Sequence, residues 1–172
     1  MSVLPIVTLP NPILRQVSAP VERIDPELLR LADDMLETMY DAPGCGLAAV
    51  QVGVPRRMFV LDCSSEDEPR QPLVLINPEI VVIGPQMRAH EEGCLSIPEF
   101  KVEIERPSSL RIKYLDREGK QQEQDAEGLL ATAIQHEYDH LQGKMIIDYL
   151  TSLKRDMVIR KFKKIARHEG DL

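Results

Sequence analysis

Apolar residues recur every three or four positions in three stretches of the chain, which is the spacing of one face of an α-helix. The first stretch follows Asp25-Pro26-Glu27, which supplies an N-cap, a proline at the first helical position and an acid, and it ends at Pro43-Gly44. The second stretch covers 129–142 and stops at Gly143, and the third runs from about Ser152 to His168. The apolar side of the third predicted helix carries Leu153, Met157, Val158, Phe162 and Ile165.

Short β-rich runs bounded by Pro, Gly, Asp or Asn lie between the first two predicted helices, a pattern typical of strands. The run Leu110–Asp116 alternates apolar and polar residues, as a half-buried antiparallel strand does. The predicted strands cover 58–62, 73–76, 79–83, 101–105, 110–115 and, after a turn, a polar strand at 121–124. Residues 1–20 contain four prolines and are expected to form an extended arm without a regular helix.

The order helix, strands, helix, helix favours an α+β fold with antiparallel β-sheets packed around a central helix and with a C-terminal helix. A length of 172 residues with 43% apolar content suits one globular domain, 1–172. No apolar run of about 18 residues is present, and Met1–Pro5 lacks the features of a signal peptide, so no membrane partner is expected. Three cysteines make no disulfide framework; reduced thiols or a metal ligand and a cytoplasmic location are expected.

The charge of the chain is unevenly distributed. The net charge is −7, yet residues 151–168 hold seven basic residues and one acid, so the rest of the chain carries −13. This asymmetry indicates either a polyanionic partner for the last helix or a solvated basic face.

The second predicted helix contains His136-Glu137-Tyr138-Asp139-His140, an H-E-x-x-H pattern. Residues four apart lie on one helical face, so His136 and His140 can bind a single metal ion. Glu137 lies beside that face and can reach water at the metal without being a ligand. The pattern is typical of metal-assisted hydrolysis, whereas two ordinary histidines on a half-buried helix are the alternative interpretation.

A catalytic metal site needs a third protein ligand, which the H-E-x-x-H pattern does not supply. One protease class has a later histidine where this chain has Ile146, and another uses a downstream acid, for which Asp148, Asp156 and Glu169 are available. Upstream, Cys94 in Glu92-Gly93-Cys94-Leu95-Ser96 would complete a His₂Cys site. A zinc endopeptidase and a binding module with a structural metal therefore remain alternatives.

A glycine-rich stretch, Gly44–Gly53, superficially fits the dinucleotide-binding pattern G-x-G-x-x-A. That interpretation needs a strand before the glycines and a helix after them, whereas here a helix precedes them. We expect the glycines instead to allow close backbone approach to a peptide substrate or a metal centre.

Taken together, Gly44–Gln51, Glu92–Ser96 and His136–His140 resemble the three ordered motifs of the peptide deformylases. The resemblance implies that Cys94, His136 and His140 bind the metal and that Glu137 is the general acid/base. It also implies that the side-chain amide of Gln51 and the backbone N–H of Leu95 stabilise the oxyanion. The implied activity is removal of the N-formyl group from the formyl-methionine of nascent polypeptides, with release of formate.

The resemblance also implies how the substrate binds. The implied substrate-binding positions are the backbone groups of Cys45, Gly46 and Gly93 and the side chains of Leu129 and Ala133. Fe²⁺ is implied as the working metal, with Zn²⁺, Ni²⁺ or Co²⁺ as substitutes, and the basic last helix suits docking on the ribosome rather than on DNA. Cys45 departs from the family, which usually has an aliphatic residue at that position, and it places an oxidisable thiol near the substrate.

Overall fold

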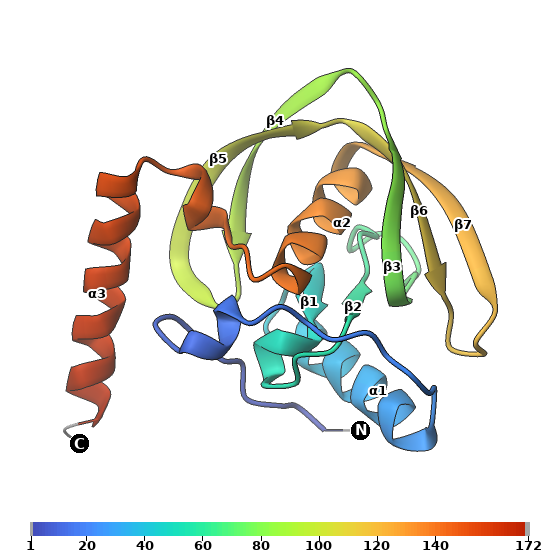
Figure 1. The fold of residues 1–172 in the computed structure, drawn as a ribbon, viewed down its shortest axis with the longest axis horizontal. Coiled ribbons are helices and arrows are strands. Elements are labelled where there is room, and N and C mark those ends of the chain that lie inside the picture. The colour runs from blue at the N-terminus through green and yellow to red at the C-terminus, as the bar shows by residue number, and fades with distance from the viewer. Residues whose placement is uncertain (1, 171–172) are drawn as a thin grey trace.

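The computed structural model describes residues 2–170 (Figure 1). Its helices are α1 (Pro26–Asp41), α2 (Gly128–Leu141) and α3 (Ser152–Gly170). Its strands are β1 (Gly46–Ala48), β2 (Met58–Leu61), β3 (Leu73–Ile83), β4 (Met87–Cys94), β5 (Ile97–Pro107), β6 (Ser109–Leu115) and β7 (Gln121–Glu127). Short 3₁₀ helices are η1 (Pro12–Arg15), η2 (Ala49–Val52) and η3 (Ile146–Tyr149). No helix within residues 2–170 is long and apolar enough to cross a membrane.

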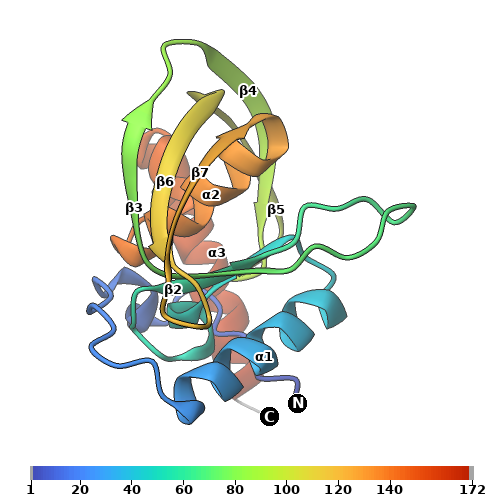
Figure 2. The same cartoon turned by 90° about the vertical axis from the view of Figure 1, so that its right-hand side faces the viewer.

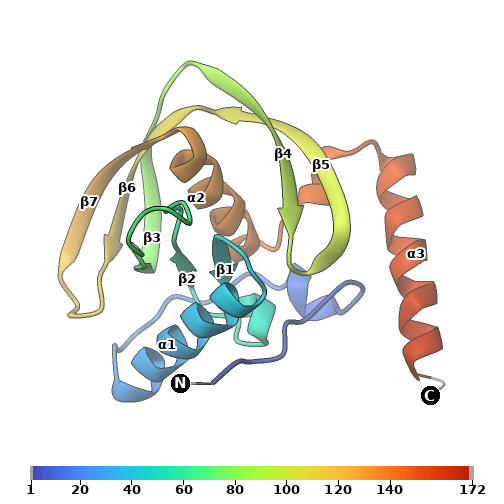
Figure 3. The same cartoon turned by 180° about the vertical axis from the view of Figure 1, so that it is seen from behind.

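The α+β prediction is confirmed, because two antiparallel sheets surround α2. The larger sheet has the order β1-β2-β3-β6-β7, and β4 pairs with β5 in a separate two-stranded sheet. The long hairpin of β4 and β5 arches over α2, and β3, β6 and β7 curve down its other side (Figures 1 and 3). One core cluster joins α2 to the larger sheet through buried side chains that include Ile134, Leu141, Phe59 and Ile112.

Helix α1 begins as its sequence predicts. The Leu28 N–H donates to Asp25 Oδ1 (2.9 Å), and Pro26 occupies the first turn, where a missing N–H costs nothing. The helix buries Leu28, Ala32, Met35 and Met39, which pack against β1, β2 and β3 in a second core cluster. It thereby supports β1, which lies within the glycine-rich stretch.

The strand predictions need correction at β1, β3 and β4; β1 (Gly46–Ala48) was not predicted. The runs 73–76 and 79–83 form one strand, β3, whose register with β6 shifts between Ile76 and Glu79. Asn77 lies at that shift with φ +49°, and its side chain bonds both the N–H and the carbonyl of Val21. Strand β4 was not predicted, because most of its residues are polar; its backbone pairs with β5 from Met87 to Cys94.

The N-terminal arm is extended, as predicted, apart from one turn of 3₁₀ helix, η1. The arm bonds to the three stretches that carry the motifs: Val7 N–H donates to Gln51 O (2.7 Å), Leu9 N–H to Ser96 O (2.9 Å) and Ser18 N–H to Leu141 O (2.9 Å). Through these hydrogen bonds, the backbone of the N-terminal arm contacts three stretches that lie far apart in the sequence.

Helix α3 lies at the side of the molecule, away from the larger sheet (Figures 1 and 3). Val158 and Phe162 are buried against the cluster beneath β5. The other residues of the predicted apolar side are exposed: Leu153 by 69%, Met157 by 59% and Ile165 by 40%. The helix therefore has a narrow contact with the body and a broad solvent-exposed surface.

Candidate metal centre and its pocket

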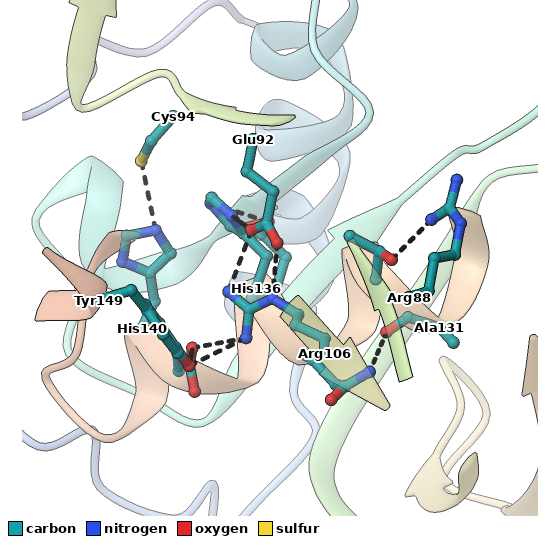
Figure 4. Close-up of polar contacts among 12 residues, drawn as sticks. Arg88, Glu92, Cys94, Arg106, Ala131, His136, His140 and Tyr149 are labelled. Atoms are coloured by element: carbon teal, nitrogen blue, oxygen red, sulfur yellow. Dashed lines mark hydrogen bonds and ion pairs between the residues drawn. The ribbon is translucent and has the colours of Figure 1, made fainter. Parts of the chain in front are cut away.

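Helix α2 and the end of β4 bring three metal-binding side chains together. His136 and His140 lie one turn apart on α2, with ring centroids 5.2 Å apart. Cys94 Sγ lies 3.4 Å from His140 Nε2 (Figure 4). The ligand atoms of Cys94, His136 and His140 all lie within 4.8 Å of one another, and all three side chains are buried or half-buried. The structure thus brings the two histidines of α2 together with the cysteine that is distant in the sequence.

A buried ion-pair network orients His136. Glu92 Oε1 lies 2.9 Å from His136 Nδ1, and the Arg106 guanidinium donates two hydrogen bonds to Glu92, at 2.6 and 3.0 Å (Figure 4). Arg106 also donates to Asp139 (2.9 Å) and to the Tyr149 hydroxyl (3.0 Å). Burial alone would raise the pKa of Glu92, but hydrogen bonds from His136 and Arg106 hold that pKa below its usual value.

The donor set fits a divalent metal ion. Because Glu92 engages Nδ1 of His136, the other ring nitrogen is left for a metal, the arrangement in which a carboxylate fixes the tautomer of a ligating histidine. Burial lowers the pKa of His140 well below its ordinary value, which keeps its imidazole in the neutral, ligating form. One sulfur and two imidazoles suit Zn²⁺ and the neighbouring transition metals.

Glu137 is buried beside the two histidines. Its Oε1 has no hydrogen-bond partner within residues 2–170, and its Oε2 lies 4.0 Å from His136 Nε2. Burial raises the pKa of Glu137 to about 7, against the lowering effect of the neighbouring His136. The backbone of Gly46 passes so close that a Cβ there would lie 2.6 Å from Glu137 Oε2. Glu137 is therefore a confined carboxyl group with one free oxygen, which suits proton transfer.

Gln51 points its amide group at the metal-binding cluster. Its Oε1 accepts from Ala48 N–H (2.9 Å), so the nitrogen end is fixed, and Nε2 donates to Ser96 Oγ (3.0 Å) and lies 3.7 Å from Cys94 Sγ. Leu95 follows Cys94 in the turn between β4 and β5 and also borders the pocket. Both predicted oxyanion-binding residues thus lie next to the cluster.

A pocket of about 590 Å³ opens above the cluster. The predicted site residues that line it are Cys45, Gly46, Gln51, Gly93, Cys94, Leu95, Leu129, Ala133, His136 and Glu137. His140 lies behind them and is 1% exposed. The structure adds Thr132, whose position between Leu129 and Ala133 on one helical face was a usable signal, and Ile6 of the arm, for which the sequence offered none.

A Cys/His/His cluster with a free carboxyl group at the floor of an open pocket defines a metal-dependent hydrolase. Comparisons with known proteins give the same class. The family described as Polypeptide deformylase matches residues 3–156. Peptide deformylases from Rhizobium meliloti (strain 1021) and Mesorhizobium japonicum are 59% and 60% identical to the chain over 170 residues each, which is 99% of this chain and 98% and 97% of those proteins.

Comparison with solved structures points to the same family. The crystal structure of peptide deformylase from Ehrlichia chaffeensis in complex with actinonin superposes with a TM-score of 0.92 at 44% identity, and the match covers 97% of this chain and 99% of that one. The chain therefore belongs to the polypeptide deformylase family. It is a metal-dependent hydrolase that removes the N-formyl group in N-terminal protein processing, and the zinc endopeptidase alternative is not favoured.

Proposed function

We propose that Cys94, His136 and His140 hold one divalent metal ion and that Glu137 is the general acid/base of deformylation. The observation that supports this assignment most strongly is the convergence of three ligand atoms within 4.8 Å beside a carboxyl oxygen that has no partner in the described residues. Asp148, a candidate third ligand of the endopeptidase alternative, instead forms an ion pair with Arg15 at 2.6 Å.

When bound, a divalent ion supplies Lewis-acid chemistry and makes water more acidic. Glu137 Oε1 accepts a proton from the attacking water, and the new carbon–oxygen bond forms at the formyl carbon. Glu137 then delivers that proton to the amide nitrogen as the carbon–nitrogen bond breaks, so that formate and a free amine leave. A carboxyl group whose pKa lies near 7 is suited to both steps, because it gains and loses a proton with little cost.

The oxyanion that forms at the formyl group is stabilised by the Gln51 amide and the Leu95 N–H. The Gln51 nitrogen is already aimed at the cluster, because its oxygen is held by Ala48 N–H. A donor that is fixed before the reaction needs no reorganisation as charge develops, which is the basis of oxyanion stabilisation.

The peptide binds as an added strand. In the described chain, β1 lies at one end of the larger sheet and pairs with β2, while β4 pairs with β5, so each has a free edge beside the pocket. The backbone groups of Cys45, Gly46 and Gly93 bond to the extended substrate, a common mode of peptide recognition. Leu129 and Ala133 contact the methionine side chain. Actinonin, which is bound in the Ehrlichia chaffeensis structure, is expected to compete for the same pocket.

Fe²⁺ is proposed as the working metal, with Zn²⁺, Ni²⁺ or Co²⁺ as substitutes. The ligand set does not select among these ions, because zinc binds such sites more tightly than ferrous iron and loading depends on availability. Metal analysis of protein purified without oxygen tests this assignment: iron should predominate, and zinc alone in fully active protein would contradict it.

The exposed basic face of α3 is proposed to dock on the ribosome, where nascent chains emerge. Truncation of α3 would be a poor test, because Val158 and Phe162 belong to the core. The test variant replaces three exposed basic residues of α3 by alanine: Lys163, Lys164 and Arg167. The control variant removes the same charge at three exposed positions elsewhere: Arg23, Arg56 and Lys120. Docking predicts that the first variant alone loses ribosome co-sedimentation at low salt; equal retention by both would contradict it.

The catalytic assignment is tested by formate release from formyl-Met-Ala-Ser. We expect release that stops when a chelator removes the metal and returns when metal is restored. Glu137→Gln should retain the metal and lose nearly all activity, because the amide cannot accept the proton. Loss of the metal from this variant would instead make Glu137 a ligand or a structural residue, and cleavage of an internal peptide bond without formate would contradict the whole assignment.

A further inference from the structure

Ser96 is a buried residue that has no role in the proposed chemistry, although it contacts Gln51 directly. Strand β4 ends at Cys94, which pairs with Ile97 at the start of β5, so Leu95 and Ser96 form the tight turn of this hairpin. Ser96 is 0% exposed, and its Oγ accepts a hydrogen bond from Gln51 Nε2 at 3.0 Å. One turn thus carries a metal ligand, one proposed oxyanion donor and a hydroxyl group that contacts the other donor.

The contacts at the two ends of the Gln51 amide decide which atom faces the metal-binding cluster. The Ala48 backbone N–H can only donate, so the amide atom that lies 2.9 Å from it is the oxygen, Oε1. The nitrogen therefore lies at the other end, where it has two N–H groups. Ser96 Oγ accepts one of them, and the other is directed toward Cys94 Sγ, a weak acceptor 3.7 Å from Nε2. This second N–H is the one that can donate to a developing oxyanion.

The amide needs both contacts because the last torsion of a glutamine side chain is soft. The χ3 torsion of glutamine has only broad preferences, so one hydrogen bond at Oε1 would leave the amide plane able to rotate. The hydrogen bond to Ser96 fixes the nitrogen end and with it the direction of the remaining N–H. Gln51 is 1% exposed, so bulk water does not compete for these contacts.

The N-terminal arm holds the backbones of both residues in place. Val7 N–H donates to Gln51 O (2.7 Å), and Leu9 N–H donates to Ser96 O (2.9 Å). Groups two residues apart on an extended chain face the same side, so one short segment of the arm can reach both carbonyls. The arm passes beneath the sheets, at the end of the molecule where the β4–β5 hairpin turns (Figures 1 and 2). Because these bonds involve only backbone atoms, a change of the Ser96 side chain should leave the two backbones in place.

We propose that Ser96 is a positioning residue, which holds the Gln51 amide so that its second N–H faces the formyl oxygen as negative charge develops there. The inference rests on the proposed function, in which Gln51 is one of two oxyanion donors. Ser96 acts through Gln51 and not on the substrate, since it is not among the residues that line the pocket.

The expected kinetic effect is on kcat. A donor that is fixed before the reaction stabilises the developing charge without reorganisation, so its anchor contributes in the transition state. Removal of an interaction made only in the transition state lowers kcat and kcat/KM equally and leaves KM unchanged. A purely structural role of Ser96 in the turn would instead disturb Cys94, and with it metal binding, because Cys94 lies at the end of the same turn.

The experiment is a double-mutant cycle of Ser96→Ala and Gln51→Leu in the nickel-loaded holoenzyme, with formyl-Met-Ala-Ser as substrate. Ser96→Gly is a second variant, because a turn tolerates glycine. Ser18→Ala is the matched control: Ser18 is also buried, at 3% exposed, and its Oγ has no hydrogen-bond partner within residues 2–170. The kcat, the KM and the bound nickel are measured for every variant.

Ser96→Ala and Ser96→Gly should lower kcat roughly tenfold with unchanged KM and nickel content, because the loss of one neutral hydrogen bond misaligns the donor without removing it. Gln51→Leu, which lacks the donor, should lose roughly 10²–10³-fold. In the Gln51→Leu background, Ser96→Ala should cause no further loss, since no amide remains to be positioned. Ser18→Ala should keep the wild-type kcat.

A wild-type kcat in both Ser96 variants would overturn the proposal, and so would an undiminished loss from Ser96→Ala in the Gln51→Leu background. Loss of nickel in step with activity, or equal slowing in Ser18→Ala, would also overturn it, because Ser96 would then have a structural role. A near-normal rate in Gln51→Leu would contradict the oxyanion assignment of the proposed function, and this inference would fall with it. A slow Gln51→Leu beside normal Ser96 variants would remove this inference alone.

Discussion

Replacing Arg106 by alanine is predicted to destabilise the fold strongly. Arg106 and Glu92 are each only 4% exposed, and the guanidinium joins Glu92 to Asp139 through hydrogen bonds of 2.6–3.0 Å. The variant would leave the Glu92 carboxylate buried with His136 as its remaining partner. Removing one member of a buried ion pair costs about 3–5 kcal/mol, because the other charge stays desolvated and uncompensated. That is a large part of the roughly 5–15 kcal/mol that stabilises an ordinary domain.

Arg111 provides a matched control, because it also lies on an antiparallel strand and contacts two acids. Its ion pair with Asp125 has a nitrogen–oxygen distance of 2.7 Å, yet the two side chains are 47% and 73% exposed. Exposed pairs contribute little, since water solvates both charges once the pair is broken. The free energy of unfolding of Arg111→Ala should therefore be close to that of wild type.

The assay is urea unfolding of metal-free wild type, Arg106→Ala and Arg111→Ala, so that metal binding does not add to the measured free energy. A second series with metal present reports the orientation of His136: loss of such a supporting partner typically weakens metal affinity roughly 10–100-fold. The reasoning is refuted if Arg106→Ala loses no more stability than Arg111→Ala in the metal-free series.

Three further predictions follow from the site and its surroundings. Gln51→Leu should slow formate release roughly 10²–10³-fold with the metal retained, and a near-normal rate would remove Gln51 from the mechanism. Gly46→Ala should cost at least roughly 10²-fold in kcat/KM, because the added methyl displaces Glu137; crystals showing Glu137 unmoved in a slow variant would contradict this cause.

The third prediction concerns the loss of folding stability at low pH. Burial alone would raise the pKa of Asp148, but hydrogen bonds from Arg15 and the Met145 N–H lower it, so its stabilising effect is present above the unfolded value near 3.8 and is lost as the pH falls below it. Arg15→Ala should therefore flatten the acid limb of a stability–pH curve, and an unchanged limb would argue against this pair.

Much of the fold was predictable because its signals are local. Helix α1 has its cap, its proline and its apolar spacing within the helix itself, and β6 alternates cleanly. Strand β4 lacked any such signal, since Met87–Cys94 is mostly polar and is held by its backbone pairing with β5. In α3 the helical spacing of the apolar residues is visible in the sequence, but which of them are buried is not, because the body contacts only a narrow part of the helix.

The functional site likewise has parts that the sequence predicts and parts that it does not. The spacing of His136, Glu137 and His140 is visible within one helical turn, whereas the third ligand came from the joint resemblance of three motifs. The role of Arg106 had no sequence signal, because its partners Glu92 and Asp139 lie on other elements and meet it through tertiary packing.

The most direct test of the metal centre is the absorption spectrum of the cobalt-loaded protein. A sulfur ligand from Cys94 predicts a sulfur-to-cobalt charge-transfer band in the near ultraviolet. The band should persist in Cys63→Ser, whose cysteine lies outside the cluster, and disappear in Cys94→Ser. Absence of the band from cobalt-loaded wild type, or its persistence in Cys94→Ser, would contradict joint binding of one ion by Cys94, His136 and His140.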